Sequence, residues 1–178
     1  MVVISVSGVQ GTGKTTLAKL LAHSQNAMLL SRGALMEGLS GAVVLPKTVD
    51  ESSRLETVGT LAYKLITTLL GEQLEIGQSV VIDCGVDSDL RKTWRQMTQE
   101  AGGTFFIIDT ICSDPDIHRQ RFEARGPTWS GEIGQTWDSL SEVRSVFQPH
   151  PEALFVADSV RPVSENMDSI VTLIEEFG

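Results

Sequence analysis

The feature that most constrains the fold is a glycine-rich segment near the N-terminus, Gly8-Val9-Gln10-Gly11-Thr12-Gly13-Lys14-Thr15. It fits the pattern G-x-x-x-x-G-K-[ST] at every specified position. Residues 2–6, before it, are mostly β-branched and predict a strand, and residues 14–23, which begin at its end, carry leucines at helical spacing. A strand, a glycine-rich loop and a helix in this order are the context that the motif requires. The chain is therefore expected to form an α/β fold around this loop.

The chemistry of the loop indicates binding of a nucleoside triphosphate. Backbone N–H groups in a glycine-rich turn can converge on phosphate oxygens, and the N-terminus of the following helix adds its positive end. Lys14 supplies a mobile positive charge, and the hydroxyl of Thr15 can ligate Mg²⁺. The residues expected to hold the nucleotide are Gly8, Gln10, Gly11, Thr12, Gly13, Lys14, Thr15 and Thr16.

The rest of the chain alternates between predicted helices and strands. Helical periodicity is longest over Glu51–Glu75, and Gly77 is expected to cap that helix. Continuous apolar runs at 79–83 and Thr104–Ile111 are typical of strands buried on both faces of a parallel sheet. Shorter strands are predicted at 27–30 and 153–157, helices at 33–39, 90–101, 115–125, 139–147 and 163–177, and a loop at 40–49. The pattern is largely βαβα, which predicts a parallel sheet between two layers of helices, in a single domain over residues 1–178.

Composition excludes several classes of function. The chain has 23 acidic and 14 basic residues, and its net charge of −9 at pH 7 repels a nucleic-acid backbone. Cys84 and Cys112 are the two cysteines and form no CxxC pair, which argues against a disulfide framework or a zinc site. No apolar run approaches the roughly 18 residues that span a bilayer, and the N-terminus has no basic leader. We expect a cytoplasmic protein with small-molecule partners; its oligomeric state is left open.

Two acidic residues compete for the role of organising Mg²⁺. Asp83 and Asp109 each follow a buried apolar run, and a carboxylate at the end of a strand beside the phosphate loop suits this role. Asp83 is preferred because Cys84-Gly85 breaks the strand directly after it, whereas Thr110-Ile111 extends the strand past Asp109. The other interpretation of Asp83 is a solvated acid at a strand end.

Three arginines fall on the predicted helix at 115–125. Arg119 has acids at helical spacing on both sides, which predicts a surface ion pair. Arg121 and Arg125 lie four positions apart on one face and have no such acids. We expect this pair to stabilise charge on a transferring phosphoryl group.

The segment at 126–138 is polar and rich in glycine, and it is expected to form a lid that closes over the reaction. Trp129 and Trp137 either stack on a planar substrate or pack this lid onto the body of the protein, and the sequence favours neither. Each histidine is interpreted as solvated or hydrogen-bonded, not as a catalytic base: His23, His118 and His150.

Together these segments resemble the small P-loop kinases that include zeta toxins, chloramphenicol phosphotransferase and the kinase half of polynucleotide kinase. The resemblance covers nearly the whole length. It rests on residues 8–16, 80–83 and 114–116, on Arg121 and Arg125, on Trp137, Asp138 and Arg144, and on 155–158. It implies a five-stranded parallel sheet of order 2-3-1-4-5, an arginine-bearing lid, and transfer of the γ-phosphate of ATP to a hydroxyl group. Lys14, Asp83, Arg121 and Arg125 are then the catalytic residues.

The sequence departs from this family at the catalytic base. Such kinases commonly carry an aspartate just after the second strand and, three residues later, an arginine that holds the acceptor, but the corresponding positions here are Gly33 and Met36. Glu37, one helical turn from Gly33, is a candidate replacement for the aspartate, and with Arg32 it could form a rearranged pair; the other interpretation of Glu37 is a solvated acid on a helix. Asp87, just beyond the third strand, is a second candidate for the base, and the sequence does not favour either Glu37 or Asp87.

The leading hypothesis is a kinase that uses ATP and Mg²⁺ to phosphorylate a hydroxyl of a nucleoside, a nucleotide or a natural product. One alternative is a P-loop protein that binds a nucleotide without transferase activity, as the missing aspartate suggests. Another is a polynucleotide 5′-hydroxyl kinase, which the acidic net charge disfavours.

Overall fold

The computed structural model describes residues 1–42, 50–85, 88–125 and 136–178. Five parallel strands form one sheet in the order β2-β3-β1-β4-β5, which confirms the expected order. The strands are β1 (Val2–Gly8), β2 (Met28–Ser31), β3 (Val80–Asp83), β4 (Thr104–Ile111) and β5 (Phe155–Asp158). Val6 of β1 pairs with Asp83 of β3, and Gly8 pairs with Thr110 of β4. The carboxyl ends of these three strands therefore meet at the edge where the glycine-rich loop begins.

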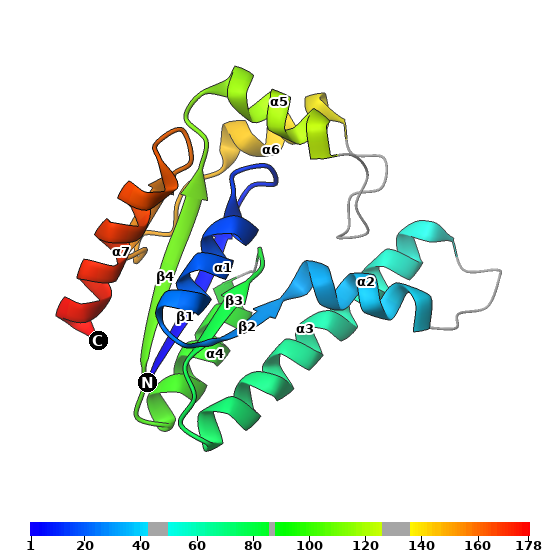
Figure 1. Ribbon diagram of the computed structural model, residues 1–178. Coiled ribbons are helices and arrows are strands. Elements are labelled where there is room, and N and C mark those ends of the chain that lie inside the picture. The colour runs from blue at the N-terminus through cyan, green and yellow to red at the C-terminus, as the bar shows by residue number, and fades with distance from the viewer. Residues whose placement is uncertain (43–49, 86–87, 126–135) are drawn as a thin grey trace.

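Helices cover both faces of the sheet (Figure 1). On one face α1 (Lys14–Ser24) and α7 (Val163–Phe177) pack against β1, β3 and β4. On the other face α3 (Glu51–Glu75) and α4 (Ser88–Glu100) pack against β1, β2 and β3. Alternate residues of β1 and β3 enter the two cores, so these central strands are buried on both sides.

The remaining helices lie at the carboxyl edge of the sheet (Figure 1). These are α2 (Arg32–Ala42), α5 (Pro115–Arg125) and α6 (Trp137–Val146). α2 continues to Ala42, although a loop was expected from residue 40 onward. α6 begins two residues before its predicted start because Thr136 and Ser139 form a capping box that stabilises the first turn. Residues 43–49 and most of the expected lid, 126–135, lie outside the described residues.

The longest helix, α3, has the bounds that its periodicity predicts. Asp50 caps its N-terminus by accepting a hydrogen bond from the Ser53 amide at 2.9 Å. At the other end Gly77 has a φ of +73°, a left-handed conformation that favours glycine. The Gly77 amide donates to the Leu74 carbonyl, so this glycine ends the helix as predicted.

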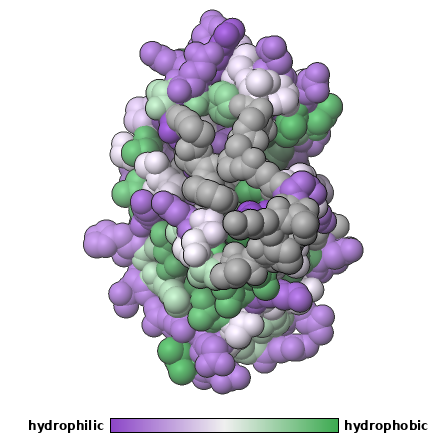
Figure 2. Space-filling view, turned by 90° about the vertical axis from the view of Figure 1, so that its right-hand side faces the viewer, coloured by the Kyte–Doolittle hydropathy of each residue, from purple (hydrophilic) through white to green (hydrophobic). Residues whose placement is uncertain are grey.

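Seen from the side of α2 and α3, hydrophilic residues lie along much of the outline of the molecule, and hydrophobic ones gather below its middle (Figure 2). The large exposed apolar side chains on α3 include Leu65, and Ile76 follows this helix. Within the described ranges no helix is both long and apolar enough to cross a membrane.

Candidate functional site

The loop between β1 and α1 takes a conformation that depends on its glycines. Gly8, Gly11 and Gly13 have φ values of +136°, +82° and +84°. A Cβ atom at Gly8 would lie 2.2 Å from the Thr110 carbonyl oxygen, and one at Gly11 would lie 3.0 Å from the His118 ring. Because neither site has room for a side chain, the backbone itself forms the cradle that a phosphate group requires.

Threonine hydroxyls hold this loop against β4. Thr12 Oγ1 donates to the Val9 carbonyl at 2.6 Å and lies 2.6 Å from Thr110 Oγ1. Thr110 Oγ1 also lies 3.0 Å from the Ser7 carbonyl, to which it donates. The loop is therefore preorganised by bonds on both sides of Gly8. Sequence reasoning placed Thr12 at the nucleotide but gave no role to Thr110.

α5 is fastened to the same loop through His118. Its Nε2–H donates to the Gln10 carbonyl at 2.6 Å, and its buried Nδ1 has no hydrogen-bond partner among the residues that the structure describes. Burial lowers the pKa of His118, so the ring stays neutral with its proton on Nε2. The ring of Trp137 meets His118 edge-on at 5.4 Å between centroids. His118 is thus a hydrogen-bonded core residue, and Trp137 packs α6 onto the body; Trp129 lies outside the described residues.

Thr15 and Asp83 provide oxygen ligands of the kind that Mg²⁺ prefers. Thr15 Oγ1 donates to Asp83 Oδ2 at 2.8 Å, and Ser31 Oγ donates to the same oxygen at 3.1 Å. Lys14, the neighbour of Thr15, donates from Nζ to the Val9 carbonyl at 3.0 Å. The residues present therefore fit a magnesium ion beside the phosphate loop.

Asp109 has different surroundings. Ser7 Oγ donates to its Oδ1, the His150 amide donates to its Oδ2, and Ser7 in turn accepts a bond from Arg91 Nη2 at 3.1 Å. Both carboxylate oxygens thus have protein donors, and the residue is buried next to Ser7 of β1, with which it pairs in the sheet. This arrangement supports the preference for Asp83.

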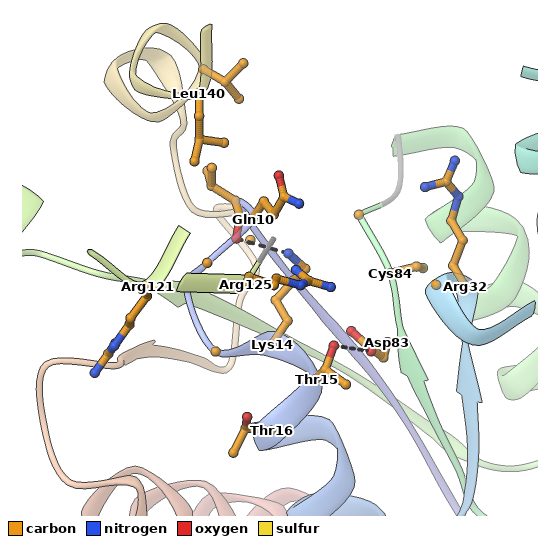
Figure 3. A pocket seen from close by; sticks show the side chains of 17 residues that line it. Gln10, Lys14, Thr15, Thr16, Arg32, Asp83, Cys84, Arg121, Arg125 and Leu140 are labelled. Atoms are coloured by element: carbon orange, nitrogen blue, oxygen red, sulfur yellow. Dashed lines mark hydrogen bonds between the residues drawn. The ribbon is translucent and has the colours of Figure 1, made fainter. Parts of the chain in front are cut away.

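A cavity of about 560 Å³ opens above the loop. Lys14, Thr15, Asp83 and Arg125 line it, together with Arg32 on the side of α2 (Figure 3). Cys84 lies at its wall, where burial raises the pKa of the thiol to about 12. The thiol therefore stays protonated at neutral pH and cannot act as a nucleophile there.

A second cavity, of about 590 Å³, lies between α1 and the segment that joins β5 to α7. Arg121 stands between the two cavities. Its Nη1 donates to Ser159 Oγ at 2.7 Å and its Nη2 to the Ser159 carbonyl at 3.1 Å. In Figure 3 its guanidinium points away from that of Arg125, which turns toward Lys14. The two arginines share a helix face, as predicted, but their guanidinium groups lie apart.

The positions around the missing aspartate are also separated. Gly33 lines the cavity above the loop, whereas Met36 is buried against Val58 and Ala62. Glu37 is exposed and lines a neighbouring cavity of about 530 Å³, which Thr15, Gly33 and Arg125 also border. Among the described residues, Asp83 is the one acid that lines the cavity above the loop. Asp87 falls outside the described residues.

Comparison with known proteins identifies the family. The sequence profile of a family described as an AAA domain matches residues 3–149. The chain belongs to this family. The matched region contains the glycine-rich loop, Asp83, Arg121 and Arg125. A search of curated proteins finds no match.

Solved structures that resemble this AAA domain protein include kinases. A protein from Chloroflexus aurantiacus J-10-fl, described as a candidate kinase, matches with a TM-score of 0.77 and 25% identity over 98% of this chain and 97% of that one. A gluconokinase from Sinorhizobium meliloti 1021 matches with a TM-score of 0.60 and 18% identity over 98% and 91%. The Mycobacterium tuberculosis APS kinase, solved with AMPPNP and APS, matches with a TM-score of 0.58 and 18% identity over 97% and 96%.

The fold is thus that of the small P-loop kinases. None of these three structures is a zeta toxin, a chloramphenicol phosphotransferase or a polynucleotide kinase, so that finer resemblance stays a prediction.

Proposed function

We propose that this AAA domain protein is a kinase that uses ATP and Mg²⁺ to phosphorylate a hydroxyl group of a small molecule. The observation that carries the proposal is the 2.8 Å hydrogen bond between Thr15 and Asp83 beside Lys14, in a cavity that Arg125 also lines. A phosphate loop alone would serve any nucleotide-binding protein. Arg125, whose guanidinium turns toward Lys14, adds a second positive charge of the kind that a phosphoryl transfer needs (Figure 3).

The two larger cavities suggest how ATP is held. Its phosphates would lie on the loop residues 8–16, and its base in the second cavity, where Thr16, Leu17 and Asn166 form part of the wall. Arg121 would brace the wall of the base cavity through Ser159. Thr15 and Asp83 would hold Mg²⁺, which when bound neutralises part of the phosphate charge.

In the reaction, the acceptor oxygen forms a bond to the γ-phosphorus while the bond from that phosphorus to the β-phosphate oxygen breaks, and ADP leaves. The hydroxyl proton passes to a base, for which Glu37 and Asp87 are the candidates. Lys14 and Arg125 stabilise the negative charge that develops on the transferring group. Since such reactions depend mainly on positioning and electrostatics, a base displaced from the position of Gly33 is compatible with turnover.

The second candidate is a nucleotide-binding protein without transferase activity, although the kinases among the similar structures do not favour it. Gly33 offers no carboxylate at the cavity wall. Asp83 is the one acid there among the described residues, and it already accepts hydrogen bonds from Thr15 and Ser31. If neither Glu37 nor Asp87 reaches an acceptor, ATP would be a structural or regulatory ligand. The net charge of −9 disfavours a polynucleotide acceptor.

The test is transfer of label from γ-labelled ATP in the presence of Mg²⁺. Nucleosides, nucleotides, hydroxylated natural products and 5′-hydroxyl oligonucleotides are offered in parallel, with Lys14→Ala as the blank. Transfer that depends on Lys14 establishes the kinase and its acceptor class, and Glu37→Gln and Asp87→Asn then identify the base. ATP binding with no transfer to any acceptor would favour the second candidate.

A further inference from the structure

Arg32 is an arginine whose charge is not paired within the described residues. It begins α2 and lines the cavity above the phosphate loop. None of the four ion pairs in the described ranges includes it, and its buried Nε has no hydrogen-bond partner. Arg95, Arg119 and Arg161, in contrast, each contact a glutamate. An arginine left without an acid beside a cavity is available to an anionic ligand.

The surroundings hold the Arg32 guanidinium in place without neutralising it. Its Cζ lies 4.6 Å from the centroid of the Tyr63 ring, and the Tyr63 hydroxyl donates to the Gly85 carbonyl. A contact with a ring face uses none of the N–H donors of the guanidinium. On α3 a Cβ atom at Gly59 would lie 2.8 Å from Arg32 Nη2, so a glycine at this position makes room for the guanidinium.

The charges around the cavity favour a small anion. The described lining residues include four cations, Lys14, Arg32, Arg121 and Arg125, against the single carboxylate of Asp83. In Figure 3, Arg32 lies on the side of α2, with Asp83 between it and Lys14. Arg32 therefore stands apart from the cations at the phosphate loop. The rest of the chain is strongly acidic, so this local excess of positive charge suits a compact anion and not a polyanion.

We infer that Arg32 binds an anionic group of the acceptor, a carboxylate or a phosphate, and so restricts the substrates to hydroxyl compounds that carry such a group. The inference rests on the proposed kinase function and names the class of its acceptor. Gly33, next in the chain, places no carboxylate beside Arg32 that would compete with the ligand.

The test measures binding of two anionic probes, glycerol 3-phosphate and malate, with glycerol as the neutral control. Titrations are made in the presence of Mg²⁺ and a non-hydrolysable ATP analogue, so that the phosphate loop is occupied. At least one anion should bind the wild-type protein, and the tighter probe shows whether the group is a phosphate or a carboxylate. Arg32→Met should weaken that binding by about 10-fold to 100-fold, the range expected when a charged hydrogen-bonding partner is lost.

Two glycine variants provide a matched pair that leaves Arg32 itself unchanged. Gly59→Ala should weaken anion binding because the new methyl group displaces the guanidinium. Gly38→Ala, on α2, should leave anion binding unchanged because a Cβ atom there meets no atom of the described part of the chain within 4 Å. Equal binding of the anions by wild type and Arg32→Met, or binding of neither anion by the wild type, would overturn the inference. The affinity for the ATP analogue, compared between wild type and Lys14→Ala, tests nucleotide binding separately.

Discussion

Asp83 and Asp109 show how the surroundings of a residue decide its role. Both belong to strands that neighbour β1, and both are almost fully buried. Asp83 accepts hydrogen bonds from two hydroxyls at the cavity, whereas Asp109 accepts one from a hydroxyl and one from a backbone amide away from it. The first arrangement leaves the carboxylate next to the phosphate loop, and the second uses the carboxylate to join β4, β1 and the residues before β5.

Replacement by asparagine should therefore lower turnover at Asp83 and the free energy of unfolding at Asp109. Asp83→Asn should weaken Mg²⁺-dependent turnover by at least about 10-fold to 100-fold. It should cost less stability than Asp109→Asn, because the Thr15 and Ser31 hydroxyls can reverse their hydrogen bonds and accept from the new amide, whereas the His150 backbone amide cannot accept. Asp109→Asn should lower the free energy of unfolding by about 1.5 to 3 kcal/mol, because a buried charge-assisted hydrogen bond is weakened, with turnover retained. Initial rates over a Mg²⁺ series and urea unfolding measure the two effects. Loss of turnover in a stable Asp109→Asn protein would show that the magnesium site has been assigned to the wrong strand.

At the scale of the element, two glycines of α3 and its C-terminal cap should respond differently to replacement by alanine. Gly71 lies inside the helix, and a Cβ atom there would be 3.5 Å from the Met97 methyl group, an ordinary contact. Gly77 follows the helix with a φ of +73°. An alanine at Gly71 reduces the entropy of the unfolded chain, whereas an alanine at Gly77 must adopt a left-handed conformation.

Gly71→Ala should raise the free energy of unfolding by about 0.5 to 1 kcal/mol. Gly77→Ala should lower it by about 1 to 2 kcal/mol. Urea unfolding of both variants, with equal dependence of the free energy on urea concentration, gives the comparison. A change of the same sign in both would mean that the capping role of Gly77 is not what ends α3.

Elements with strong local signals could be predicted with their bounds. The apolar periodicity of α3 and its glycine cap lie within one stretch of sequence, and both are found. The start of α6 was missed because the signal is the capping box of Thr136 and Ser139, while the prediction used apolar spacing. Periodicity placed Arg121 and Arg125 on one face, but it carries no information about Ser159, a partner 38 positions away that turns Arg121 aside.

At the scale of the whole molecule, the positions of the glycine-rich loop after β1 and of Asp83 at the end of β3 could be predicted, because a motif and a strand end are local features. The strand order came from the resemblance to a family, since periodicity alone does not order strands. The contacts that support the loop were not predicted: Thr110 bonds to Ser7 and His118 to Gln10 across more than 100 positions. Such contacts depend on how the sheet and α5 assemble, and no local pattern of residue types encodes them.

A nucleotide that binds across these elements should stabilise the whole molecule. The residues that line the two larger cavities come from four of the five strands (β1, β3, β4 and β5), from α1, α2, α5, α6 and α7, and from the segments between them, so an unfolded chain cannot reproduce the site. A ligand that binds only the folded state, present at a concentration of 100 times its Kd, raises the free energy of unfolding by about 2.7 kcal/mol. For a chain of this size that corresponds to an increase of about 5 to 11 °C in the thermal midpoint.

Thermal unfolding with Mg²⁺ and ATP should show this increase in the wild-type protein, and a smaller one when Mg²⁺ is removed by a chelator. Lys14→Ala should lose most of it because the phosphates lose their mobile cation, whereas Arg32→Met should keep it because Arg32 serves the acceptor and not the nucleotide. An equal increase in wild type and Lys14→Ala would place the nucleotide away from the loop. A loss in Arg32→Met as large as that in Lys14→Ala would assign Arg32 to ATP instead of the acceptor.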